Sequence, residues 1–132
     1  MSLNQNNEIL DVVIIGGGLV GGLTALLLAQ GGVQPTVLDA APILDADKTL
    51  DVANPRVLAL SQATIHLLKI VGVWNKLARQ QPYTGMQVWN KNGYGDINFG
   101  QPSEKTPSVE QALGSMVEPS ILNLAIQQKM LD

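Results

Sequence analysis

The feature that most constrains this chain is a cluster of glycines inside an apolar run near the N-terminus. Seven of the 13 glycines fall between Gly16 and Gly32, and Thr24 is the only polar side chain from Val12 to Ala29. An apolar stretch of about 18 residues is the length at which a membrane-spanning helix becomes possible. The run therefore has two competing interpretations, a helix in a bilayer or a buried strand, turn and helix.

Around these glycines the sequence carries strand and helix signals in alternation. A β-branched run from Ile9 to Ile15 ends at the first glycines, which is typical of a strand covered on both faces. A helix is predicted from Leu19 to Ala29, and a second strand from Thr36 to Leu38. Together these segments predict a βαβ unit over residues 9–39.

The turn between the first strand and the helix matches the pattern G-x-G-x-x-G from Gly16 to Gly21. In this pattern Gly16 allows a sharp turn, Gly18 lets the backbone approach a pyrophosphate, and Gly21 lets helix and strand pack closely. The helix N-terminus favours an anion, and the backbone N–H groups of Leu19 and Val20 are the expected donors. The alternative is a βαβ turn whose glycines serve packing alone.

An acid and an arginine extend this candidate nucleotide site. Asp39 follows Gly16 at close to the separation, about 20 residues, of the acid that binds the adenosine ribose. Its charge would repel a 2′-phosphate, which disfavours NADP here. Arg56 follows in a later loop, and a guanidinium beside a dinucleotide can pair with phosphate. A solvated surface cation is the simpler explanation of Arg56 from these residues alone.

The membrane interpretation is the weaker of the two. Five glycines lie between Gly16 and Gly22, and each costs a helix about 1 kcal/mol relative to alanine. Glu8 and Asp11 are the only charges close to the start of the run, so no basic segment marks a signal peptide. We therefore expect no transmembrane segment.

The remainder of the chain is predicted to consist of short strands, helices and polar loops. In chain order these are a loop over 40–55, an extended piece over 56–60, a helix capped by Ser61 and reaching Val71, further turns over 74–80, a hairpin of strands 83–89 and 94–99, a loop over 101–110, a strand over 115–117 and a helix over 121–131. Asn92-Gly93 is a strong signal for a two-residue hairpin turn. The fold class is thus α/β, a Rossmann-like dinucleotide-binding fold with an added β-hairpin.

The amino-acid composition argues against several classes of ligand and of functional site. A net charge of −3 with eight lysines and arginines argues against nucleic acid as a ligand. The charges form no run, so an electrostatic membrane patch is not indicated. Without cysteine the chain has no disulfide, thiolate metal site or thiol nucleophile. No metal site is expected, because His66 is the only histidine and lacks a suitable partner.

Three blocks of sequence occur in an order that resembles one family. They are GGGLVGG at residues 16–22, VLDA at 37–40 and RVLALSQATIHLLKIVGVW at 56–74, followed by the stretch at 82–89. They resemble the FAD-dependent aromatic-ring hydroxylases of ubiquinone biosynthesis, group A flavoprotein monooxygenases with the p-hydroxybenzoate hydroxylase fold. The resemblance extends from about Asp11 to the helix near Leu131 and weakens toward the C-terminus.

The resemblance implies FAD as the cofactor and assigns residues to it. The implied contacts are Gly16, Gly18, Leu19, Val20, Gly21, Asp39 and Arg56. Asp39 would take the place of the ribose-binding acid, where the family more often has glutamate, and Arg56 would lie along the phosphate and flavin portions. Glu118 stands where the family tends to have a Glu-Asn pair, but Pro119 replaces the Asn, which leaves a cofactor contact there open.

The resemblance also implies an activity and its limits. Family members take hydride from NAD(P)H and use O2 to hydroxylate an electron-rich ring, here implied to be a polyprenyl phenol or quinol, and FAD carries the difficult chemistry. Their second FAD motif and most of the sheet over the substrate have no counterpart after Gly100. We therefore expect residues 1–132 to be an N-terminal FAD-binding domain, a fragment inactive alone, with an incomplete fold.

The sequence also leads to expectations about self-association, cellular location and alternative functions. Exposed apolar surface predicts self-association. We expect a cytoplasmic protein, with peripheral contact at the inner membrane as an open alternative. A non-catalytic dinucleotide-binding or assembly module, and an NAD-dependent dehydrogenase fragment, are the alternative functions.

Overall fold

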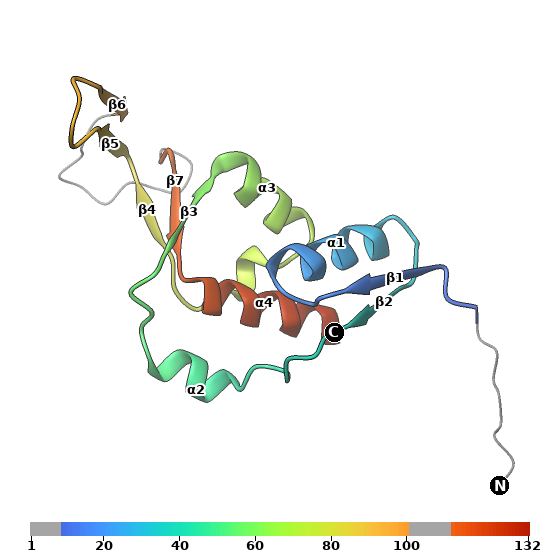
Figure 1. The fold of residues 1–132 in the computed structure, drawn as a ribbon. Coiled ribbons are helices and arrows are strands. Elements are labelled where there is room, and N and C mark those ends of the chain that lie inside the picture. The colour runs from blue at the N-terminus through green and yellow to red at the C-terminus, as the bar shows by residue number, and fades with distance from the viewer. Residues whose placement is uncertain (1–8, 101–111) are drawn as a thin grey trace, which may run out of the picture.

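A computed structural model describes residues 9–100 and 112–132 of the chain (Figure 1). Its elements in chain order are β1 (Val12–Ile15), α1 (Leu19–Gln30), β2 (Pro35–Leu38), α2 (Ala46–Asp51), β3 (Leu58–Ser61), α3 (Gln62–Ile70), the 3-10 helix η1 (Trp74–Lys76), β4 (Gln81–Tyr83), β5 (Gly85–Trp89), β6 (Asp96–Gly100), β7 (Gly114–Val117) and α4 (Pro119–Leu131). The strands form three small sheets, β1–β2, β3–β7–β4 and β5–β6.

The N-terminal unit is the predicted βαβ arrangement. β1 and β2 are parallel, with Val12 beside Pro35 and Ile15 beside Leu38, and α1 connects them (Figure 1). The glycines therefore divide the apolar run into a strand, a turn and a helix. Within the two described ranges, no helix has both the length and the apolar character needed to cross a membrane. The α/β fold class is confirmed.

The first strand is covered on one face only, so the prediction of cover on both faces is wrong for the described chain. α1 packs on the face that carries Ile14, where Gly21 lies against it. On the opposite face Val13, Ile15 and Leu38 are 44%, 89% and 54% exposed. A β-branched run identifies a strand, but the number of layers around it depends on distant elements.

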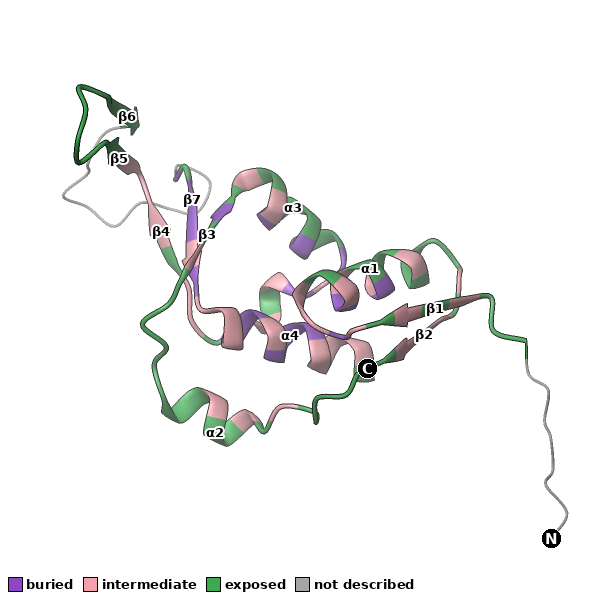
Figure 2. Cartoon of the chain, in the orientation of Figure 1, coloured by how far each residue is buried: buried purple, intermediate pink, exposed green. Residues whose placement is uncertain are grey.

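The main core lies between α3, α4 and the β3–β7–β4 sheet, where Figure 2 shows most of the buried residues. Its buried members are Leu60, Ile65, Leu68, Val71, Val73, Val117, Leu122, Ala125 and Ile126. α4 also packs along α1, and a side chain at Gly22 would collide with Ile126 there. The core is thus connected to the βαβ unit of β1, α1 and β2 by the packing of α4 on α1.

The helix predicted after Ser61 is confirmed, with its expected start and stop. Ser61 Oγ accepts a hydrogen bond from Thr64 N at 3.3 Å, which caps α3. Gly72 has a φ of +76° immediately beyond the last turn. A residue other than glycine would be strained in that conformation.

Two local predictions are wrong in detail. The segment 40–55 contains the short helix α2, because the Asp45 carboxylate accepts from Asp47 N and Lys48 N and caps its first turn. In the hairpin, Trp89 pairs with Asp96, so residues 90–95 form the connection rather than a two-residue turn. The loop predicted over 101–110 lies outside the described residues.

Candidate functional site

The glycine turn leaves β1 through a backbone conformation that requires glycine. Gly16 has a φ of +98°, and its N–H donates to the carbonyl oxygen of Leu38 at 2.7 Å. This bond attaches the start of the turn to the end of β2. The turn is therefore fixed between the two parallel strands before α1 begins.

The next glycines differ in what surrounds them. A Cβ at Gly21 would fall far inside contact distance of the Gly16 carbonyl oxygen, whereas a Cβ at Gly18 would meet no atom within 4 Å. Gly21 thus allows α1 to approach the turn, as the fingerprint predicts. Gly18 borders open space, and a bare backbone there leaves room for a ligand group.

The N-terminus of α1 offers unpaired backbone donors toward this space. Gly18 is the N-cap and supplies no side-chain hydrogen bond. The first intrahelical bond runs from Gly22 N to Gly18 O at 2.8 Å, so the preceding N–H groups of Leu19 and Val20 have no acceptor within the helix. Donors at a helix N-terminus with the positive end of its dipole suit a phosphate or pyrophosphate.

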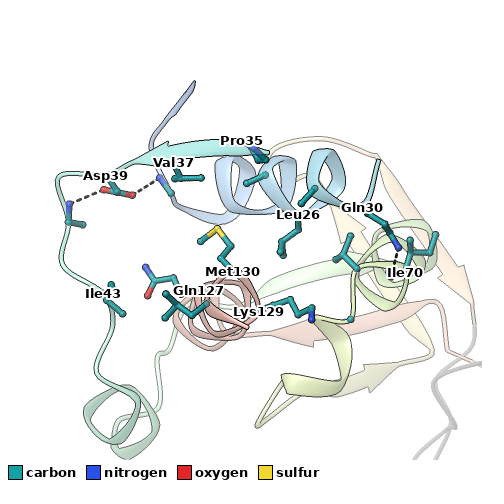
Figure 3. Close-up of a pocket in the computed structure, with 17 residues that line it drawn as sticks. Leu26, Gln30, Pro35, Val37, Asp39, Ile43, Ile70, Gln127, Lys129 and Met130 are labelled. Carbon is teal, nitrogen blue, oxygen red and sulfur yellow. Dashed lines mark hydrogen bonds between the residues drawn. The ribbon is translucent and has the colours of Figure 1, made fainter. Parts of the chain in front are cut away.

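Asp39 lies at the C-terminal end of β2 and bonds to the turn itself (Figure 3). Its Oδ2 accepts from Gly17 N at 2.5 Å, and its Oδ1 accepts from Ala41 N at 2.8 Å. The hydrogen bonds from Ala41 N and, next, Gly17 N hold the pKa of Asp39 below its ordinary value. The carboxylate therefore stays charged and keeps further lone pairs for a ribose hydroxyl. The spacing in the sequence predicts that the acid belongs to the nucleotide site, but it does not predict the bond to Gly17.

The structure does not bring Arg56 into contact with the glycine turn. Arg56 is exposed just before β3, and its backbone N–H donates to Asn54 Oδ1 at 2.9 Å. Its guanidinium makes no hydrogen bond or ion pair with the described part of the chain. Its assignment to FAD rests on the family resemblance.

An ion pair that sequence analysis missed lies near this arginine. Arg79 Nε donates to Glu118 Oε1 at 2.8 Å, and Arg79 Nη2 donates to Oε2 at 3.2 Å. Asn54 N donates to the same Oε2 at 2.7 Å. These contacts, that of Arg79 first, lower the pKa of Glu118. The Glu118 carboxylate thus faces the loop before β3 instead of capping its own helix.

A mostly apolar cavity of about 830 Å³ opens between α1, β2 and α4 (Figure 3). Asp39 lies at one end of it and Gln30 and Ile70 at the other (Figure 3), and Gly17 is also in its lining. Its lining takes alternate residues of β2, Pro35 and Val37, which pair with Val12 and Ile14 on the face of the sheet that α1 covers. The acid is therefore adjacent to an apolar space as well as to the turn.

The described residues contain no cluster of side chains suited to hold a metal ion. Residues 9–100 and 112–132 bring no group of three histidine, cysteine, aspartate or glutamate side chains together. The arrangement instead combines backbone donors, a charged acid and an open turn, which suits a phosphate-containing nucleotide.

Comparison with known proteins points the same way. The sequence profile of the family described as FAD binding domain matches residues 9–129. The chain is 36% identical over 131 residues to 3-demethoxyubiquinol 3-hydroxylase of Escherichia coli, covering 96% of this chain and 31% of that protein. It is 31% identical over 126 residues to ubiquinone hydroxylase UbiL of Rhodospirillum rubrum, covering 94% and 28% respectively. The chain thus spans about a third of the length of these curated relatives.

One solved structure shares the fold at low sequence identity. It is the peptidyl tryptophan dihydroxylase QhpG, essential for tryptophylquinone cofactor biogenesis, with a TM-score of 0.53 and 20% identity. The match covers 91% of this chain and 22% of that one. The arrangement of elements described above is therefore found within a much longer protein.

Proposed function

The chain belongs to the FAD binding domain family, and from that premise we propose that it is the FAD-binding part of a monooxygenase that hydroxylates an aromatic ring. The observation that carries the proposal is the glycine turn, whose open space at Gly18 faces uncapped N–H groups beside a charged Asp39. The curated relatives named as ubiquinol and ubiquinone hydroxylases support a quinol or phenol as the substrate class.

The residues of the turn have distinct roles in this proposal. Gly16 and Gly21 shape the turn, while Gly18 and the N–H groups of Leu19 and Val20 receive the pyrophosphate. Asp39 accepts hydrogen bonds from the adenosine ribose while it braces Gly17. As the family resemblance implies, Arg56 would lie along the phosphate and flavin portions of a bound FAD. When bound, FAD supplies the redox chemistry, with NAD(P)H and O2 as co-substrates.

The proposal extends to place and association. The exposed apolar face of β1 and β2, formed by Val13, Ile15 and Leu38, supports association between copies of this chain. We place the protein in the cytoplasm, where peripheral contact with the inner membrane would give access to a polyprenyl substrate. The 132-residue chain contributes cofactor binding and no hydroxylase turnover of its own.

Thermal unfolding with FAD, ADP and NAD tests the cofactor assignment. A ligand at about 100 times its Kd adds about 2.7 kcal/mol to the unfolding free energy, so FAD should raise the Tm. Gly18→Ala should keep the unliganded Tm but lose this response, because the new Cβ meets no protein atom and enters the space reserved for the pyrophosphate. Gly95→Ala is the matched control, since that position is equally open but lies in the hairpin loop.

The competing functions predict other results. A rise with NAD and none with FAD would favour the dehydrogenase alternative. No response to any nucleotide would favour a non-catalytic assembly module. If FAD raised the Tm of Gly18→Ala as much as that of the unaltered chain, the glycine turn would not be part of the FAD site.

A further inference from the structure

The Arg79–Glu118 ion pair is the best enclosed of the ion pairs in the described residues. Glu118 precedes α4, and its side chain is 12% exposed; Arg79 lies between η1 and β4 and is 38% exposed. The two contacts of the guanidinium with the two carboxylate oxygens form a bidentate pair. Such pairs fix orientation as well as charge.

Arg79 also reaches the end of α2 and the chain that follows it, where we call residues 52–56 the Asn54 segment. Arg79 Nη1 donates to Leu50 O at 2.7 Å at the end of α2, and Nη2 reaches Val52 O at 3.4 Å. Asn54 N donates to Glu118 Oε2, and Asn54 Oδ1 accepts from Arg56 N. An unbroken series of hydrogen bonds therefore runs from the ion pair to the backbone of Arg56.

These bonds are what holds the Asn54 segment in place. Within residues 9–100 and 112–132, its hydrogen bonds to other parts of the chain all go to Arg79 or Glu118. The segment has no secondary structure and is exposed, so packing adds little restraint. Without the ion pair, the segment would keep its covalent connections to α2 and β3 and a bond from Asn54 N to a less restrained Glu118 carboxylate, so the backbone that carries Arg56 would be held less firmly.

We propose that Arg79 and Glu118 are positioning residues that hold the Asn54 segment so that Arg56 is presented to FAD. The geometry of the attachment stands on the contacts above, and its consequence for the cofactor rests on the proposed function. A guanidinium is needed at residue 79, because a lysine would have neither the planar fork nor enough directed donors for four acceptors. Neither residue needs to touch the cofactor.

Hydrogen exchange of the 132-residue chain tests the attachment without any ligand. In Arg79→Ala the Glu118 carboxylate loses its guanidinium partner, so the Asn54 amide that donates to it should exchange about tenfold faster or more, and the Arg56 amide, which donates to the Asn54 side chain, should follow. Tenfold corresponds to about 1.4 kcal/mol, and a hydrogen bond to a charged group contributes at least that much. Lys76→Ala is the matched control: it breaks the 3.0 Å pair between η1 and Asp132 at the other end of α4. It should leave both amides unchanged. Equal exchange in all three proteins would overturn the proposal.

A double-mutant cycle tests the consequence. Fluorescence titration with FAD should show about tenfold weaker binding for Arg79→Ala, and no further loss when Arg56→Ala is already present. Glu118→Gln keeps an acceptor for Asn54 N without the charge and should give a smaller loss, so the test survives if Arg79→Ala unfolds. Additive losses would overturn action through Arg56.

The two experiments separate two failures. If the unaltered chain fails to bind FAD, the proposed function is wrong, and hydrogen exchange still decides whether the ion pair holds the segment. If FAD binds but Arg79→Ala binds it equally well, the positioning proposal is wrong and the cofactor assignment stands.

Discussion

The two sheets that flank α1 and α4 differ sharply in how they are enclosed. In the β3–β7–β4 sheet Ser115 and Val117 are almost completely buried, and the surrounding helices contribute most of the core. In the β1–β2 sheet Ile15 is 89% exposed and one face has no cover among the described elements. Most of the buried apolar packing that stabilises the fold therefore lies away from the glycine turn.

This difference indicates which region of the molecule a bound ligand would stabilise most. Parts of a protein that bind ligands are often drawn from its less stable regions, since they must adjust on binding. Here the N–H groups of the glycine turn are held by the Leu38 carbonyl oxygen and the Asp39 carboxylate rather than by a deep core. FAD should consequently stabilise the β1–β2 region more than the β3–β7–β4 region.

Two isoleucines give the sharpest test of the comparison. Ile126→Ala should lower the unfolding free energy by about 2–5 kcal/mol, because Ile126 is 1% exposed and packs against Gly22 in the interface between α4 and α1. Ile15→Ala, the same substitution on the exposed face, should change it by less than about 0.5 kcal/mol. Urea unfolding measures both. Similar losses would show that the β1–β2 face is enclosed in solution.

Gly21→Ala tests the turn itself and should have the next largest effect. The added Cβ would collide with the Gly16 carbonyl oxygen, and such overpacking costs about 1–3 kcal/mol. The substitution should also weaken FAD binding, because the turn must move to relieve the collision. Gly95→Ala, in open space, controls for the general effect of replacing glycine. Unfolding and FAD titration that both match the unaltered chain would contradict the packing role of Gly21.

What the sequence predicted follows from how local each signal is. The βαβ unit was predictable because strand, glycine turn, helix and acid lie within residues 9–39, and α3 was predictable from its cap at Ser61. The missed α2 carries a comparable local signal at Asp45. By contrast, Glu118 contacts Arg79 and Asn54, which precede it in the sequence by 39 and 64 positions. No local pattern encodes such pairing, so the ion pair and the one-sided cover of β1 required the three-dimensional arrangement.

The exposed β1–β2 face should also govern association between copies. Ile15→Lys should reduce self-association by about tenfold in concentration, since it removes apolar area and places like charges opposite each other. Val88→Lys is the matched control, because Val88 is exposed on the separate β5–β6 hairpin. Sedimentation over a range of concentrations measures the effect. A larger loss in Val88→Lys would transfer the association surface to the hairpin.

The loss of unfolding free energy at acid pH should be the smallest effect. It can be measured separately for Glu118, beside the β3–β7–β4 sheet, and for Asp39, beside the glycine turn. The pKa of Glu118 is lowered in the folded chain from its ordinary value of 4.5, chiefly by the hydrogen bond from Arg79 and then by Asn54 N. The stabilisation is therefore complete above that ordinary value and is lost as the pH falls through the folded pKa. Glu118→Gln should flatten this acid limb of the unfolding free energy.

Asp39 provides the comparison in the other region. Its pKa is also lowered, by backbone hydrogen bonds from Ala41 and Gly17 rather than by a guanidinium, so its contribution has the same sign. The charge–charge part of the Glu118 contribution should diminish in high salt, whereas neutral backbone donors to Asp39 are less sensitive to ionic strength. Urea unfolding of Glu118→Gln and Asp39→Asn from pH 6 downward, at low and high salt, separates them. A salt-independent acid limb for Glu118 would mean that Asn54 N, not Arg79, supplies most of the stabilisation of its carboxylate.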